Sequence, residues 1–295
     1  MTHVGSWRGG LAAFAGVGLL AILGMLGCQK DPTPDPKTDD NKETTAKKPD
    51  PEPLMKDHSS DPNYRFRQSF ADATRFDQYA DWEPVEQTMA KKPIGPMFEK
   101  IKKGWDDVLL LTSDNKKLSY VATLDTERGP IEITMRPDLA PNHVRSFVSL
   151  IQAGYYDGLV FERTITEQGP DGVVQLIEGG APDGGTNPST DGVGYWLKPE
   201  IHPEAKHEVG TVGASHAYEE DTAACRFYIM VSKSPILDGH WTVFGKVTKG
   251  MEVANEIFRQ PTVEDLESPS AGRPVKPVVI RKVTVTRREI EGGTN

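Results

Sequence analysis

The sequence predicts a mainly β domain from residue 118 onward, built as a closed antiparallel barrel with helical lids. Apolar residues there alternate with period two over short runs, which is typical of half-buried strands. Asp-Gly pairs recur between these runs, and both residues are favoured in tight turns. Only two helical patterns interrupt the strands, and many short strands with two helices favour a barrel.

The expected strands begin with Leu118 to Leu124 and Ile131 to Met135, where the alternation is clearest. Further apolar runs occupy residues 173–177, 227–231, 242–247 and 278–285. Asp-Gly turns stand at 157–158, 171–172, 183–184, 191–192 and 238–239.

The first lid helix is expected to begin at Pro141, because proline suits the first turn of a helix, and to stop at Gly154. Its buried side would carry Val144, Phe147, Val148 and Ile151. The second helix is indicated by helical pairs of apolar residues, Val253 with Ile257 and Ala254 with Phe258.

Residues 63–117 are expected to form a helical extension in front of the barrel. Phe66, Phe70 and Ala73 fall at helical spacing and predict a helix over Tyr64 to Asp77. A longer apolar stripe predicts a second helix from Ile94 to Leu109. Such stripes are usually packing faces, so we expect both helices to pack on the main domain.

The first 27 residues are typical of an export signal. Arg8 precedes a roughly 16-residue apolar run, which is short for a membrane span and suitable for a secretory signal. The residues before Cys28 resemble a bacterial lipobox, which implies cleavage there and a lipid on the Cys28 sulfur. A plain signal anchor with a buried Cys28 is the alternative. Gln29 favours the outer membrane, with the protein facing the periplasm.

Residues 28–62 are rich in Pro, Asp, Lys and Thr and contain no aromatic residue, which predicts a disordered tether. The whole chain has a net charge of -9, 37% hydrophobic residues and two cysteines. These values exclude a polytopic membrane protein, a disulfide-stapled mini-domain and a strongly basic nucleic-acid binder. Lipidation of Cys28 would leave Cys225 as a free thiol, so no disulfide is expected.

A set of motifs in the barrel region resembles the cyclophilins, a family of barrel-shaped peptidyl-prolyl isomerases. The motifs are Ala140–Phe147, Gly154–Gly158, Phe161–Arg163, Gly179-Gly180, Gly210–Val212, Arg226–Ile229, Leu237–Gly239 and Val243–Val247. The resemblance covers about 170 residues, from Leu118 to Arg288. It implies an eight-stranded antiparallel barrel capped by two helices over residues 118–290.

The members of that family accelerate a slow step, the rotation about the peptide bond that precedes a proline. The barrier about a peptide bond is roughly 18–20 kcal/mol, and X-Pro bonds interconvert unaided in tens to hundreds of seconds. The reaction needs no nucleophile, metal or cofactor. It needs an apolar pocket for the proline ring, hydrogen bonds to the preceding carbonyl, and a cation near the prolyl nitrogen.

The resemblance places the catalytic arginine at Arg163, with Glu178 and Tyr228 as the other catalytic positions. Leu176, Tyr228 and Leu237 would line the proline pocket, although each also suits an ordinary core. The peptide would be bound by Gln175, Leu176, Ser215, His216, Arg226, Ile236, Leu237 and Trp241.

Three of these positions depart from the family pattern. Gln175 stands where an aromatic residue is usual, and Glu178 where a glutamine is usual. A carboxylate beside Arg163 would fix the guanidinium and compete with substrate for its donors, so we expect lowered activity. Ile236 replaces a tryptophan that some members use to bind cyclosporin, which makes sensitivity to that drug doubtful.

The sequence therefore predicts an isomerase that assists the folding of exported proteins and binds proline-containing polypeptides, as a monomer. The alternative is a weakened cyclophilin-like module that only binds such peptides or a partner. A hydrolase using Glu162 and Glu178 is disfavoured because the arginine beside them would keep a carboxylate ionised. Zinc is disfavoured because the histidine spacings match no ligand pattern, so exposed or capping histidines are expected at His202, His207, His216 and His240.

Overall fold

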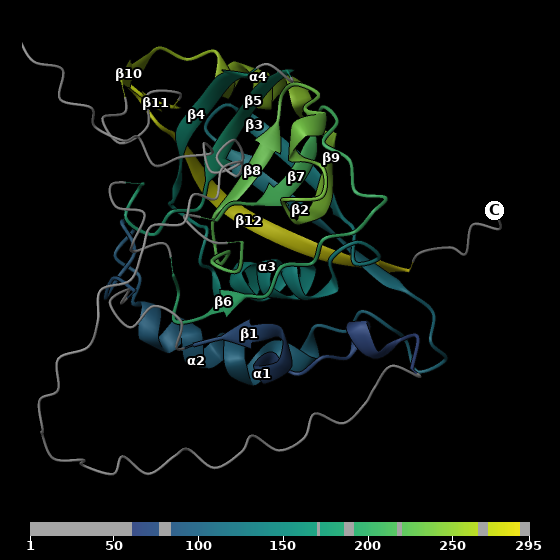
Figure 1. Cartoon of the computed structure of the whole chain (residues 1–295). Helices are drawn as coiled ribbons and strands as arrows, with labels where there is room; N and C mark the ends of the chain where they lie inside the picture. Colours follow the sequence, from purple (N-terminus) through teal and green to yellow (C-terminus); the bar gives the residue numbers. More distant parts are fainter. Residues whose placement is uncertain are drawn as a thin grey trace, which may run out of the picture.

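A computed structural model of the chain describes residues 61–76, 84–169, 172–185, 192–216, 220–264 and 271–289. The expected signal segment, Cys28 and all of the tether before Asp61 lie outside these residues. Figure 1 shows a mainly β molecule in which few helices accompany the strands. The expected β class is confirmed.

Eight strands form a ring of antiparallel pairs. Their neighbour order is β4–β12–β2–β3–β9–β7–β8–β5, and β5 pairs back with β4. Their bounds are β2 Leu118–Thr126, β3 Gly129–Met135, β4 Val160–Gly169, β5 Gly172–Gly179, β7 Thr211–Ala214, β8 Phe227–Met230, β9 Val243–Lys249 and β12 Val278–Glu289. Two short strands, β10 (Thr262–Glu264) and β11 (Ala271–Pro274), add a hairpin that is bonded to β4.

Two helices accompany the ring, as the sequence predicts. Helix α3 (Pro141–Ala153) begins with a proline, and it ends where Gly154 adopts a left-handed conformation with φ of 76°, which favours glycine. Helix α4 spans Met251–Phe258. The two helices lie at opposite ends of the set of strands (Figure 1).

The main core fills the space between the strands and α3. Phe147 of α3 packs against the rings of Tyr156, Phe227 and Phe244 at centroid distances of 4.9, 5.5 and 5.2 Å. Such tilted and edge-on aromatic pairs add to the gain from burying their area. The core fixes the ring strands, and through them the side chains on the outer face.

The N-terminal extension differs from the sequence prediction in its first half. The expected helix over Tyr64 to Asp77 is largely wrong, because only α1 (Phe70–Ala73) is α-helical, after a 3₁₀ turn at η2 (Tyr64–Phe66). Ser69 caps α1 by accepting a hydrogen bond from the Asp72 N–H, so the helix begins there. It then ends because β1 (Thr74–Arg75) pairs with β6 (Trp196–Leu197).

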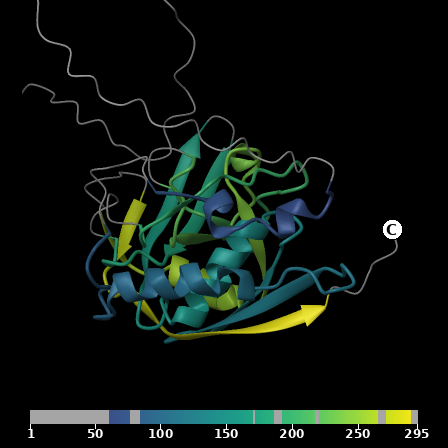
Figure 2. The same cartoon turned by 90° about the horizontal axis from the view of Figure 1, so that it is seen from below.

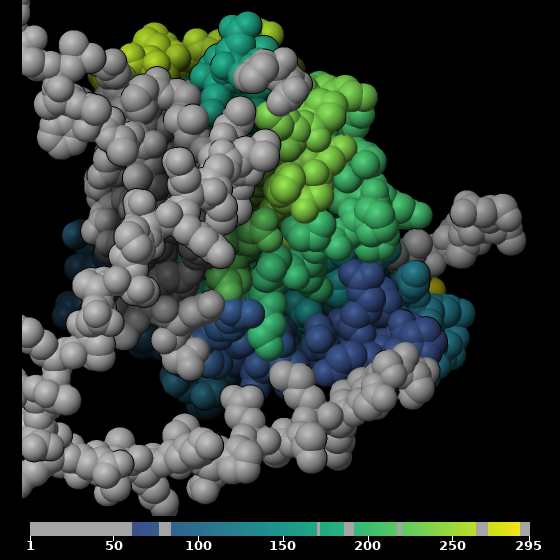
Figure 3. Space-filling model, in the orientation of Figure 1, coloured from purple at the N-terminus to yellow at the C-terminus, as the bar shows by residue number. Residues whose placement is uncertain are grey.

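The second expected helix is present as α2 (Ile94–Gly104), followed by a 3₁₀ turn, η3 (Trp105–Asp107), that ends two residues before Leu109. Buried residues of the extension belong to the same core as the ring, among them Phe66, Phe70, Ile94, Ile101 and Trp105. Figure 2 shows α2 lying across the base of the molecule, and Figure 3 shows the extension against the surface of the main domain.

One buried side chain of α3 ties the extension down. Arg145, 4% exposed, donates hydrogen bonds to the carbonyl oxygens of Phe66 at 2.7 Å, Gln68 at 2.8 Å and Val108 at 3.2 Å. Its guanidinium also lies 5.6 Å from the centre of the Trp105 ring. The extension is therefore part of the folded unit.

Candidate functional site

A second apolar cluster lies on the outer face of the strands, separate from the main core. Neighbouring residues of a strand point to opposite faces. Ile177 and Ile229 accordingly point into the main core, while the residues beside them point outward. This outer cluster consists of Ile165, Val174, Leu176, Tyr228, Met230, Leu237 and Ala271, with Ile236 and Trp241 packed against it.

The outer cluster therefore brings together five of the residues that the sequence assigns to catalysis or peptide binding. Leu176, Tyr228 and Leu237 are each at most 4% exposed, while Ile236 and Trp241 are partly buried at its border. Strands β5 and β8 supply Leu176 and Tyr228, and a 3₁₀ turn, η5 (Pro235–Leu237), supplies Leu237. These side chains are apolar or aromatic, as a pocket for a proline ring requires.

Arg163 lies beside the outer cluster on β4, two residues before Ile165 and therefore on the same face. It stands opposite Glu178 of β5. The Arg163 Nη1 atom is 3.4 Å from Glu178 Oε2, and the Arg163 side chain is 17% exposed. The Ser215 hydroxyl donates a hydrogen bond of 2.7 Å to the other carboxylate oxygen. Glu178 is thus held between a cation and a hydroxyl.

His216 follows Ser215 and stacks on the Trp241 ring, with centroids 5.2 Å apart and planes 13° apart. Neither ring nitrogen has a hydrogen-bond partner among the described residues. Burial lowers the pKa of His216 to about 4, against the opposing effect of the Glu178 and Asp221 carboxylates. His216 is therefore a neutral ring at pH 7 and presents a flat surface beside the cluster.

Tyr228 is fixed by a chain of hydrogen bonds that the sequence does not predict. Its hydroxyl is 2.8 Å from His207 Nε2, and His207 Nδ1 is 2.9 Å from the Asp238 carboxylate. Burial raises the pKa of Tyr228 and lowers that of His207, so both are neutral at pH 7. Gly213 allows this arrangement, because a Cβ there would lie 2.1 Å from the Tyr228 hydroxyl oxygen.

The expectation that these histidines are exposed or caps is wrong for His207, which is 1% exposed, while His216 is half-buried. The presence of Tyr228 in an apolar strand could have indicated a buried hydrogen-bond partner such as His207. A buried tyrosine hydroxyl needs a hydrogen-bond partner, and the rest of β8 is apolar.

Two of the expected peptide contacts, Gln175 and Arg226, are not members of the outer cluster. Gln175 is not part of the outer cluster, because it alternates with Leu176 along β5 and stands opposite Thr166. Arg226 makes an ion pair with Glu162, with 3.3 Å between Arg226 Nε and Glu162 Oε1, and both side chains are buried. Glu162 is paired with Arg226 and Glu178 with Arg163, so each carboxylate lies beside a cation that would keep it ionised, which disfavours the hydrolase.

We call the surface made by Arg163, Glu178, Ser215, His216 and the outer cluster the Arg163 face. The described residues contain no group of three or more His, Cys, Asp or Glu side chains that could hold a metal ion. No helix within the described ranges is long and apolar enough to cross a membrane.

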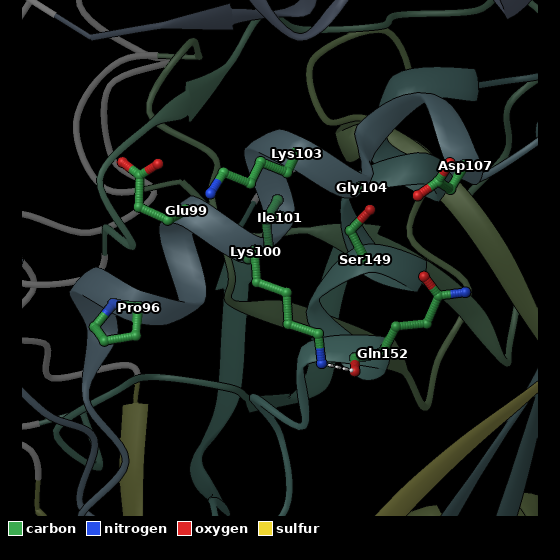
Figure 4. A pocket seen from close by; sticks show the side chains of 9 residues that line it. All are labelled: Pro96, Glu99, Lys100, Ile101, Lys103, Gly104, Asp107, Ser149 and Gln152. Carbon is green, nitrogen blue, oxygen red and sulfur yellow. Dashed lines mark hydrogen bonds between the residues drawn. The ribbon is translucent and has the colours of Figure 1, made fainter.

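The structure also has a hollow away from the Arg163 face, between α2 and α3, with a volume of about 620 Å³ (Figure 4). Lys100 reaches across it and donates a 2.8 Å hydrogen bond to the Gln152 carbonyl. None of the residues that the sequence assigns to catalysis or peptide binding lines this hollow.

Comparison with known proteins agrees with this geometry. The profile of the family described as cyclophilin type peptidyl-prolyl cis-trans isomerase/CLD matches residues 121–285. The chain belongs to the cyclophilin family. The match covers α3, α4, the whole Arg163 face and the ring strands except the start of β2 and the end of β12, while the extension lies outside it.

Individual cyclophilins resemble the chain to different extents. Peptidyl-prolyl cis-trans isomerase B of Bacillus subtilis is 40% identical over 137 residues, which are 46% of this chain and 88% of that protein. Peptidyl-prolyl cis-trans isomerase-like 2 of Cryptococcus neoformans is 32% identical over 200 residues, 66% of this chain, and the chain spans 31% of its length.

A crystal structure of a cyclophilin type peptidyl-prolyl cis-trans isomerase from Cryptosporidium parvum has a TM-score of 0.48 at 23% identity. The similarity covers 57% of this chain and 98% of that one.

Proposed function

We propose that the protein is a peptidyl-prolyl cis-trans isomerase and that the Arg163 face is its active site. The observation that carries the proposal is the position of Arg163, a permanent cation on the same strand face as a separate apolar cluster. Membership of the cyclophilin family supports it. Each tenfold acceleration requires about 1.4 kcal/mol of stabilisation that is specific to the twisted amide.

The proline ring of the substrate would lie on Leu176, Tyr228 and Leu237. As the amide twists, the lone pair localises on the prolyl nitrogen, and the guanidinium of Arg163 stabilises this charge without transferring a proton. The hydrogen bonds from Asp238 through His207 to Tyr228 keep the aromatic ring in place, so the pocket is preorganised.

Glu178 would moderate the activity. Its carboxylate is within 3.4 Å of Arg163 and is held by Ser215, so it competes with the substrate for the guanidinium. The chain would then be a slower isomerase than one with a neutral side chain at this position.

The wider proposal concerns the place of the domain in the cell. The ring of eight strands would be the closed cyclophilin barrel with a packed interior, acting as a monomer on exported polypeptides. Cys28 would carry the lipid that holds the protein to a bacterial membrane, facing the periplasm, and Gln29 favours the outer membrane. Stable anchoring requires more than one acyl chain. Loss of radiolabelled palmitate incorporation in Cys28→Ser would support this anchor, and retained incorporation would contradict it.

The test of the activity is isomerisation of a short X-Pro peptide by the full-length chain in detergent, compared with Arg163→Ala. We expect kcat/KM to fall at least about tenfold in the variant. Arg281→Ala is the matched control, because Arg281 is an exposed arginine on β12 that pairs with Asp125. No acceleration by a folded wild-type chain would refute the proposal.

The alternative function is a module that binds proline-containing peptides without isomerising them. The ion pair between Arg163 and Glu178 favours it, since a guanidinium held by a carboxylate is less available to the amide. Titration of the same peptide by calorimetry separates the two functions. Binding without acceleration would establish the module.

A further inference from the structure

The extension reaches the Arg163 face through β6. Strand β1 pairs with β6 so that Thr74 stands opposite Leu197. On its other side, Leu197 donates its N–H to the carbonyl of Ala223 at 2.7 Å. Strand β1, strand β6 and Ala223 therefore lie side by side, and we call residues 220–226, around Ala223, the flank segment.

A side-chain contact reinforces this arrangement. Arg75 of β1 forms an ion pair with Asp221 of the flank segment, whose side chain is 14% exposed. Next to it, the Lys198 ammonium donates a 2.7 Å hydrogen bond to the Asp72 carbonyl. A partly buried pair is screened less by salt than an exposed one. The extension is thus linked to the flank segment directly by charge, and by backbone pairing through β6.

The flank segment in turn borders the Arg163 face. The Ser215 N–H donates a 3.1 Å hydrogen bond to the Arg226 carbonyl. Glu220 lies 3.9 Å from His240, the neighbour of Trp241. The Asp221 carboxylate is also close enough to His216 to act on its charge. The flank segment is therefore tied to Ser215 by a backbone hydrogen bond and to the neighbouring His216 by charge.

We propose that Arg75 is a positioning residue for the Arg163 face, and that the extension acts through it to hold His216 where substrate binds. The proposal rests on the isomerase function proposed above. Arg163 itself is held by the pairing of β4 with β5, which does not involve the extension. Loss of Arg75 should therefore weaken substrate binding more than it slows the rotation.

The kinetic test compares Arg75→Ala with the wild-type, full-length chain in detergent. We expect KM for an X-Pro peptide to rise about two- to fivefold while kcat changes less than about twofold, as suits the loss of one partly exposed ion pair. Arg75→Lys keeps the charge and should recover most of the loss. Arg67→Ala is the matched control, because Arg67 lies in the same extension and pairs only with exposed groups described there, Asp61 and Asn115.

The second measurement does not depend on activity. The imidazole of His216 is titrated by NMR in each variant, where its pKa responds to burial, to the Glu178 and Asp221 carboxylates and to His143. Removing the Arg75 cation leaves Asp221 uncompensated, so the His216 pKa should rise by roughly half a unit or more. Asp221→Asn removes the carboxylate and should shift the pKa in the opposite direction while raising KM in the same way.

The outcomes separate the two proposals. Opposite shifts of the His216 pKa in Arg75→Ala and Asp221→Asn, with none in Arg67→Ala, support the positioning role even if wild type shows no isomerase activity. If His216 titrates alike in wild type and Arg75→Ala, the positioning role is refuted, whatever the kinetics. A rise in KM with an unchanged His216 would likewise refute it.

Discussion

Two arginines, Arg145 and Arg163, lie in different regions of the domain and have different surroundings. Arg145 faces the extension, is 4% exposed and donates to three backbone carbonyls. Arg163 faces outward with a side chain that is 17% exposed, beside a carboxylate at 3.4 Å. The first guanidinium joins two parts of the fold, whereas the second is partly exposed beside the outer cluster.

The contrast teaches that charge alone does not mark a functional arginine. What distinguishes the two is the nature of the acceptors and the surface next to them. Backbone carbonyls of a packed segment make Arg145 structural, and an outward apolar cluster beside Arg163 makes it a candidate for catalysis. Each of the following changes should affect one side of the molecule and spare the other.

The largest effect is expected from Arg145→Met. Three carbonyl oxygens would lose their donor while remaining buried, so the free energy of unfolding should fall by roughly 3 kcal/mol. Urea denaturation at 25 °C measures this loss, and activity per folded molecule should be kept. Arg128→Ala, at an exposed pair with Glu256, is the control. Equal stability of Arg145→Met and wild type would remove the structural role.

Arg163→Met should lower activity and leave stability nearly unchanged. Activity should fall about a hundredfold, which corresponds to about 2.7 kcal/mol of transition-state stabilisation. The midpoint of urea unfolding should stay close to that of wild type, because the side chain is partly exposed. A loss of stability as large as that of Arg145→Met would show that both arginines are structural.

Lowering the pH should destabilise the fold through the Arg163 face, where His216 becomes protonated. It should not change the contacts of Arg145, which stays charged. The pKa of folded His216, about 4, lies below its ordinary value of 6.5. Stability is therefore full above pH 6.5 and is lost as the pH falls toward 4, since the unfolded chain takes up the proton first.

We expect His216 to contribute about 2 kcal/mol of this loss between pH 6.5 and 4.5. His207, whose pKa is also lowered by burial, acts in the same direction. The contribution of His216 is therefore measured as the difference in pH dependence between wild type and His216→Asn. Identical pH profiles of unfolding in the two proteins would contradict the buried, neutral state of His216.

The smallest effect concerns Glu178→Gln. Replacing the carboxylate by an amide keeps a partner for Ser215 but releases Arg163 from a charged competitor, so kcat/KM should rise about two- to fivefold. Glu256→Gln, far from this surface and paired with Arg128, is the control. An unchanged turnover in Glu178→Gln would end the hypothesis that Glu178 moderates activity.

Much of the fold could be predicted because its signals are local. Apolar alternation and short apolar runs marked six of the eight ring strands, all but β4 and β7, and Pro141 and Gly154 marked the ends of α3. The helix expected over Tyr64 to Asp77 failed because β1 is defined by its pairing with Trp196 and Leu197. No spacing within the extension contains that information, since the competing partner lies far along the chain.

The candidate site likewise contains residues that the sequence predicted and contacts that it did not predict. Its resemblance to a family gave Arg163, Leu176, Tyr228 and Leu237, which the structure brings onto one face. The bonds from Tyr228 to His207 and from Arg75 to Asp221 connect residues distant in sequence. They depend on how loops cross the ring, so residue types alone could not reveal them.

The closed order of strands has a consequence for how polypeptides can be handled. Each strand of the ring has a partner on both sides within the described part of the chain. Unpaired strand edges invite edge-to-edge aggregation with extended chains. Beside Arg163, β5 and β8 are paired on both sides, so a protein whose proposed substrates are unfolded polypeptides offers them no such edge there. It must bind them through side chains and not by adding a strand to its sheet. It can therefore release them without breaking backbone hydrogen bonds between strands.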